Sequence, residues 1–307
     1  MTALPWGLAA LLVSLVLSSL VLSACGSGEQ GKAGATDGDG RDRVAVVASF
    51  YPLQFATEQI GGSHVAVTSL TKPGAEPHDI ELTPREVGTV SSAKIVIFQK
   101  GLQSAVDKAV ESQGGDRGLD VVPAANLDRK LASGSIDPHF WLDPQRYSGI
   151  ATVISARLAA VDPANKADYE KNAKDFAARL AALAKEFRTG LATCQRKDLV
   201  TSHSAFGYLT ERFGMKQVAI NGLAPDQEPK PADLAAVSAY ARANGVRTIY
   251  AETLVSPAVA ETVAREAGAT MATLDPIEGL TGQSSGKDYF EVMRANLKAL
   301  RAGQSCS

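Results

Sequence analysis

The sequence predicts an α/β fold with two lobes, each a mainly parallel sheet flanked by helices, joined by one long helix. Three observations lead to this expectation. Short β-branched runs alternate with stretches of helical spacing in the first part of the chain, the alternation stops between about residues 145 and 193, and it then resumes to the end. Alternation of this kind is typical of βαβ units and parallel sheets.

In the first half, four short apolar runs have the composition of buried strands, and helical spacing fills the segments between them. We expect strands at 44–49, 65–70, 94–98 and 119–122, and helices at 52–60, 84–92 and 102–112. This region, 44–162, forms the predicted N-terminal lobe.

The middle of the chain predicts one long helix. Asp162 and Pro163 read as a helix stop followed by a helix start. From Lys166 to Leu191 the apolar residues then recur every three or four positions, which indicates an amphipathic helix of about 40 Å at 1.5 Å per residue. The linking segment is 163–193. Its apolar positions are Tyr169, Ala173, Phe176, Leu180, Leu183, Ala184 and Phe187.

Strand–helix alternation resumes in the predicted C-terminal lobe, 194–307. Strands are expected at 198–202, 216–220, 247–251 and 269–274, with helices at 205–213, 231–243, 257–267 and 287–301. In parallel α/β sheets, ligands bind beyond the carboxyl ends of the strands. Two such lobes can present these ends to each other, so we expect the functional site in the cleft between them.

The first 24 residues carry no charged side chain and end in Leu22-Ser23-Ala24-Cys25. The apolar run is shorter than the roughly 20 residues of a membrane span and fits a signal peptide, here 1–24. A small-residue site followed by cysteine matches the bacterial lipobox, so we expect lipid on Cys25. An uncut membrane anchor is the alternative, and the lack of basic residues before the run leaves open a start codon further upstream.

Residues 25–43 are expected to form a tether behind the lipidated cysteine. Gly26–Arg43 holds almost nothing apolar and cannot bury enough surface to offset its ordering entropy. As a flexible chain it would span about 20–25 Å. The expected location is therefore extracytoplasmic, on the outer face of the cell membrane.

Charge and cysteine content narrow the function further. The formal net charge is −2 and there is no basic block, so nucleic-acid binding has no electrostatic support. Besides Cys25, only Cys194 and Cys306 are present, and neither belongs to a CxxC motif. In an exported protein two such cysteines favour a disulfide over a metal pair.

Three of the four histidines follow predicted strand ends. His78 lies after strand 65–70, His139 after strand 119–122 and His203 at the end of strand 198–202, while Asp275 directly follows strand 269–274. Three imidazoles and one carboxylate can bind zinc tetrahedrally. Each histidine taken alone is more often a turn or capping residue, and His64, after a glycine pair, is interpreted as a solvated turn residue.

Five motifs resemble the zinc- and manganese-binding solute-receptor family of ABC importers, the ZnuA/TroA type. They are GAEPHDIELTP, DPHFWLDP, TSHSAFGYLTERFG, INGLAPDQEPKPADL and TLDPIEGLT, in the family's order. The resemblance implies two lobes on a rigid helix and a monomer that delivers metal to a membrane permease, without enzymatic activity. It places the metal ligands at His78, His139, His203 and Asp275, with Glu278 as the alternative fourth ligand.

The resemblance favours zinc as the transported ion. Manganese members often have glutamate where this chain has His203, and a third imidazole suits Zn²⁺ better than the harder Mn²⁺. The stretch Gly114–Ser135 holds no histidine, so it lacks the His-rich loop of many zinc members.

Three alternatives remain open at this point. One is a manganese or iron receptor of the same family. Another is an extracellular zinc hydrolase with Glu76 or Glu278 as base, which would need an open coordination position. The third is an additional role as a surface adhesin.

Overall fold

The computed structural model describes residues 43–131, 134–223 and 228–307. The predicted signal peptide, Cys25 and all of the predicted tether before Arg43 lie outside the described residues. Within the described ranges, none of the helices combines the length and the apolar character needed to cross a bilayer.

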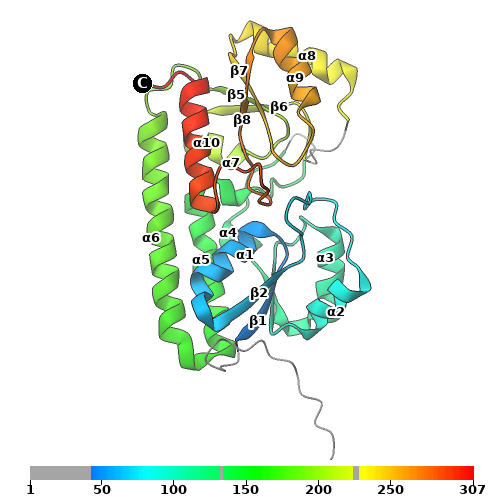
Figure 1. The fold of residues 1–307 in the computed structure, drawn as a ribbon, viewed down its shortest axis with the longest axis vertical. Coiled ribbons are helices and arrows are strands. Elements are labelled where there is room, and N and C mark those ends of the chain that lie inside the picture. Colours follow the sequence, from blue (N-terminus) through cyan, green and yellow to red (C-terminus); the bar gives the residue numbers. More distant parts are fainter. Residues whose placement is uncertain (1–42, 132–133, 224–227) are drawn as a thin grey trace, which may run out of the picture. The chain divides into compact units, whose positions relative to one another are not determined.

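The N-terminal lobe is built on a four-stranded parallel sheet in the order β2-β1-β3-β4 (Figure 1). Its strands are β1 (Val44–Ala48), β2 (Val65–Ser69), β3 (Ile95–Phe98) and β4 (Gly118–Asp120). All four residues of β3 are buried, as expected of a central parallel strand covered on both faces. The helices of this lobe are α1 (Tyr51–Gly61), α2 (Pro84–Ser92), α3 (Ser104–Ala109), continued by a π-helical turn (Val110–Gly114), and α4 (Val122–Ala125).

The C-terminal lobe repeats this topology. Its parallel sheet has the order β6-β5-β7-β8, so in both lobes the first strand lies between the second and the third. The strands are β5 (Asp198–Thr201), β6 (Lys216–Ala219), β7 (Thr248–Ala251) and β8 (Thr270–Thr273). The helices are α7 (Gly207–Arg212), α8 (Pro231–Ala243), α9 (Ala258–Ala267) and α10 (Tyr289–Gly303). The predicted fold class and all eight predicted strands are therefore confirmed.

The long helix is α6, which runs from Lys166 to Leu191 and confirms the predicted bounds. It is antiparallel to α5 (Pro144–Val161), after the 3₁₀ turn Pro163–Asn165, and it contacts α1 of the N-terminal lobe and α10 of the C-terminal lobe (Figure 1). Its buried face is the predicted apolar stripe, extended by Leu191. The buried residues are Tyr169, Ala173, Phe176, Leu180, Leu183, Ala184, Phe187 and Leu191.

One buried apolar cluster extends from the N-terminal lobe through α5 and α6 into the C-terminal lobe. It includes Phe50, Phe176, Leu199 and Tyr289 from these regions. Because apolar burial is the main favourable term in folding, this shared core resists separation of the lobes. The predicted disulfide between Cys194 and Cys306 is also present, and it links the segment after α6 to the C-terminus.

Candidate metal centre

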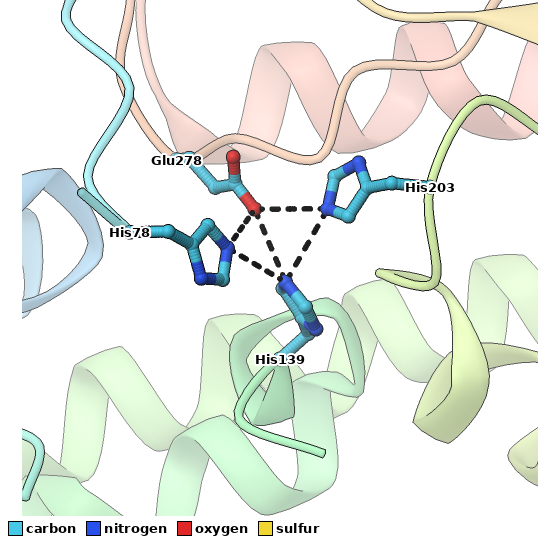
Figure 2. Close-up of side chains that lie close together, drawn as sticks. All are labelled: His78, His139, His203 and Glu278. Atoms are coloured by element: carbon cyan, nitrogen blue, oxygen red, sulfur yellow. Dashed lines mark hydrogen bonds and ion pairs between the residues drawn. The ribbon is translucent and has the colours of Figure 1, made fainter. Parts of the chain in front are cut away.

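Four loops bring the side chains of the candidate site together (Figure 2). His78 lies between β2 and α2, and His139 lies between α4 and the 3₁₀ turn Phe140–Leu142. His203 follows β5 and Glu278 follows β8. Two side chains thus come from each half of the chain, as the positions after the strand ends predict for the histidines.

The four side chains surround one point. His139 Nε2 lies 3.3 Å from His78 Nε2 and 3.4 Å from His203 Nε2. Oε1 of Glu278 lies 3.3, 3.2 and 3.3 Å from Nε2 of His78, His139 and His203, respectively. A tetrahedral ion with bonds of 2.0–2.1 Å holds its ligand atoms about 3.3–3.4 Å apart. Five of the six distances between these atoms therefore match a zinc-sized ion, and all four atoms lie within 4.8 Å of one another.

The site is buried. His139, His203 and Glu278 have no exposed surface, and His78 is 9% exposed. A cavity of about 170 Å³ adjoins Glu278 and is also lined by Tyr51, Gln54, Thr71, Lys72, Pro73, Gly279 and Leu280. The second carboxylate oxygen of Glu278, Oε2, is buried without a hydrogen-bond partner.

Carboxylates orient two of the rings from behind. Nδ1 of His139 lies 2.8 Å from Asp137 Oδ1, and Nδ1 of His203 lies 2.6 Å from Glu252 Oε1. Because an ionised carboxylate only accepts hydrogen bonds, the proton of each neutral ring lies on Nδ1. The lone pair of Nε2 is then available to a metal ion. Asp137 is itself paired with Arg129 Nε at 3.1 Å.

These two carboxylates and Glu278 shift the pKa values of the rings. Burial lowers the pKa of His203, but the charges of Glu252 and Glu278 outweigh it and raise that pKa well above its usual value. Burial also lowers the pKa of His139, and hydrogen bonds to Asp137 and Glu278 raise it above its usual value. Burial raises the pKa of Glu278, but His203 and the other rings hold it well below its usual range. A metal ion must therefore displace protons from this site.

Asp275, the expected fourth ligand, does not join this cluster. Its carboxylate accepts hydrogen bonds from Ile277 N–H at 2.8 Å, Thr253 Oγ1 at 3.2 Å and Ser284 Oγ at 3.1 Å. After Asp275 the chain turns through Ile277, whose φ is +57°, and Glu278 faces the imidazoles instead. The geometry thus favours the alternative ligand, Glu278.

Glu76, the other acid considered in the sequence, lies beside the cluster, and His64, interpreted as a turn residue, is not part of it. Glu76 accepts from His78 N–H at 2.9 Å, and its Oε1 is 3.9 Å from His78 Nε2. Burial, followed by the charge of Glu278, raises the pKa of Glu76 to about 8. Nε2 of His64 instead lies 3.0 Å from Oδ2 of Asp168 on α6, within hydrogen-bond distance.

The sequence analysis did not identify Asp137 and Glu252, the outer partners of the rings. The position of each in the sequence could have indicated it. Asp137 stands two residues before His139 in DPH, a spacing at which its Oδ1 also accepts the His139 backbone N–H at 3.0 Å. Glu252 directly follows β7, at the same sheet edge as His203.

Fold and site together define a two-lobed protein with a buried cluster of three imidazoles and one carboxylate that can hold a metal ion. A profile of the family described as "Zinc-uptake complex component A periplasmic" matches residues 46–303. The chain belongs to this family.

Two relatives match along most of this chain. The high-affinity zinc uptake system protein ZnuA of Bacillus subtilis (strain 168) is 35% identical over 92% of this chain and 93% of its own length. The zinc-binding lipoprotein AdcA of Streptococcus pneumoniae (strain ATCC BAA-334 / TIGR4) is 34% identical over 94% of this chain but only 60% of its own length. This chain therefore corresponds to one part of AdcA.

Solved structures share the fold. The Zn(II)-bound ZnuA-like domain of Streptococcus pneumoniae AdcA has a TM-score of 0.73 and 34% identity, over 85% of this chain and 99% of that domain. The laminin-binding protein Lmb of Streptococcus agalactiae, described as a bifunctional protein with adhesin and metal-transporting activity, has a TM-score of 0.79 and 31% identity over 85% of this chain and 99% of Lmb.

Proposed function

We propose that this protein captures Zn²⁺ outside the cytoplasmic membrane and delivers it to the membrane permease of an ABC importer. The observation that carries the proposal is that five distances among the three imidazole nitrogens and the Glu278 oxygen are 3.2–3.4 Å, the edge length of a tetrahedral zinc site. The zinc-uptake family and the names of the relatives support it.

The proposed ligands are His78, His139, His203 and Glu278. Three imidazoles with one carboxylate favour Zn²⁺ over Mn²⁺, which prefers more oxygen ligands. The ion is the cargo of this protein, so its four ligands must also release it. Glu278 helps to line the adjoining cavity of about 170 Å³, which is a candidate path for that exchange.

A receptor fits the site better than a hydrolase does. A hydrolytic zinc site keeps one position for water and a base beside it. Glu278, one of the two bases considered, is among the four ligands proposed here, and four protein ligands would leave no tetrahedral position for water. Glu76 lies against His78, with burial and neighbouring charge raising its pKa to about 8.

The proposal extends to anchoring. A lipid on Cys25 would hold the receptor as a monomer at the outer face of the membrane, next to its permease, with residues 25–43 as the tether. The name of the relative AdcA, a zinc-binding lipoprotein, supports this location. Cell fractionation tests the anchor. The variant Cys25→Ser should no longer associate with the membrane, and it should still bind zinc.

Metal analysis of the purified protein tests the function. We expect one zinc per chain, and in competition titrations Mn²⁺ should fail to displace it at equal concentration. Preferred binding of Mn²⁺ would support the manganese receptor instead, whereas turnover of an ester or amide panel that is lost on chelation would support the hydrolase.

Zinc affinity is expected to fall as the pH is lowered from about 8 to about 6. In the metal-free protein the pKa values of His139 and His203 are raised, so both rings hold protons at pH values above the ordinary histidine pKa of about 6.5. Zinc must displace these protons, and lowering the pH therefore favours the metal-free form.

Calorimetric titration of zinc in buffers with different ionisation enthalpies measures the protons released. The binding enthalpy should depend on the buffer near pH 7. Identical enthalpies in all buffers, with an affinity that does not change with pH, would contradict a site made of three imidazoles.

A further inference from the structure

Asp275 carries a buried carboxylate that is not one of the four proposed metal ligands. It is 2% exposed and begins the turn that ends at Glu278. We propose that Asp275 is a positioning residue, which holds this turn in the one conformation that directs Glu278 at the three imidazoles. The inference rests on the proposed zinc-binding function.

The turn needs a restraint because Ile277 has a left-handed backbone. Its φ is +57°, and among the described non-glycine residues with positive φ, Asn126, Ile277 and Ser305, it alone has a β-branched side chain. Such a residue leaves this region unless its surroundings hold it there. With Ile277 in an extended or right-handed conformation, Glu278 would project in another direction.

The Asp275 carboxylate supplies that restraint. Its Oδ1 accepts the Ile277 N–H at 2.8 Å, the short-range bond by which aspartate stabilises turns. Its Oδ2 accepts from Thr253 after β7 at 3.2 Å and from Ser284 before α10 at 3.1 Å. One side chain thus ties two other segments of the C-terminal lobe to the turn.

Two further side chains hold the backbone of the turn. Asn296 of α10 accepts from Asp275 N–H at 2.9 Å and donates to Asp275 C=O at 2.7 Å. Trp141 donates its indole N–H to the Pro276 C=O at 2.7 Å, and its ring lies 5.2 Å from that of His139. The turn is therefore positioned relative to a ligand of the other half of the chain.

These bonds also argue against Asp275 as a ligand. Its two oxygens together accept hydrogen bonds from three donors. Turning the carboxylate toward the metal would leave the buried Ile277 N–H without an acceptor. Glu278 has the opposite environment, since its Oε1 faces three imidazole nitrogens and its Oε2 has no partner.

Asp275→Asn and Asp275→Ala separate the two roles. Asparagine keeps an oxygen for the Ile277 N–H and an amide for the hydroxyls of Thr253 and Ser284, so D275N should lose less than about 10-fold in zinc affinity. Alanine frees the turn, and D275A should lose about 10- to 100-fold, the range for residues that orient a ligand. E278A, which removes the proposed ligand itself, is the reference variant.

The absorption spectrum of bound Co²⁺ gives a second readout, because it reports the ligand set directly. The D275N spectrum should match that of the wild type, and the D275A spectrum should move toward that of E278A. S284A removes one hydroxyl without touching the Ile277 bond and should bind zinc with less than about 10-fold loss. Thermal unfolding of the metal-free variants separates a moved ligand from a damaged fold.

Two results would overturn the inference. Loss of zinc affinity in D275N as large as in E278A would make Asp275 a ligand, and D275N decides this even if D275A does not fold. Wild-type affinity in a folded D275A would leave Asp275 without a positioning role. Failure of the wild type to bind zinc would instead refute the proposed function, so the two failures are distinguishable.

Discussion

Replacing His203 with alanine is expected to lower zinc affinity more than about 100-fold, because even changes in the outer partners of metal ligands cost about 10- to 100-fold. His203 supplies one of three buried imidazoles, and its Nε2 lies 3.3 Å from Glu278 Oε1. Its loss would also leave Glu252 buried without the Nδ1–H to which it is bonded at 2.6 Å. Competition with a zinc chelator of known affinity measures the effect.

His64→Ala is the matched control for this experiment. His64 is the one histidine outside the cluster, and it pairs with Asp168 on α6. Its removal should leave zinc affinity within about threefold of the wild type, since an exposed ion pair contributes only about 0–1 kcal/mol. Equal losses in H203A and H64A, or no loss in H203A, would refute the three-imidazole site.

Phe176→Ala is expected to lower the free energy of unfolding by about 3–5 kcal/mol, the usual cost of removing a buried phenylalanine ring. Phe176 is 2% exposed in the middle of α6. The centroid of its ring lies 6.1 Å from the ring centroid of Phe55, 5.5 Å from that of Tyr147 and 6.1 Å from that of Phe290. The substitution therefore opens a cavity where both lobes pack against the long helix.

Urea unfolding of the metal-free protein measures this cost. Lys174→Ala, on the exposed side of the same helix, should change the free energy of unfolding by less than about 0.5 kcal/mol. If F176A unfolds like K174A, the buried stripe of α6 does not hold the lobes together. Zinc binding by folded F176A should persist, because none of the four proposed ligands lies on α6.

Periodicity made the fold predictable. The bounds of α6, Lys166 and Leu191, follow from apolar residues every three or four positions after Asp162-Pro163. The strand positions follow from short β-branched runs, and β3 is buried on both faces as its continuous apolar sequence indicates. The short helix α4 was not expected, because four residues are too few for a periodic pattern.

The histidines were predictable because strand ends in parallel sheets point to one edge. The carboxylate was not, since Asp275 and Glu278 follow the same strand and differ only in how the chain turns between them. That turn depends on Asn296 and Trp141, which are distant in sequence from it. The outer partners Asp137 and Glu252 likewise acquire their roles from contacts with rings that they reach only in the folded chain.

The amino-acid sequence by itself determined two parallel α/β lobes, the long helix between them and the three imidazoles, because apolar periodicity and strand ends are local properties of the chain. The tertiary structure alone decided that Glu278 and not Asp275 faces those imidazoles. The physical reason is that the direction of the Glu278 side chain depends on the backbone of Ile277, which is left-handed with a φ of +57°. The local bond from Asp275 holds that residue, and hydrogen bonds with Thr253, Ser284 and Asn296 in turn hold Asp275.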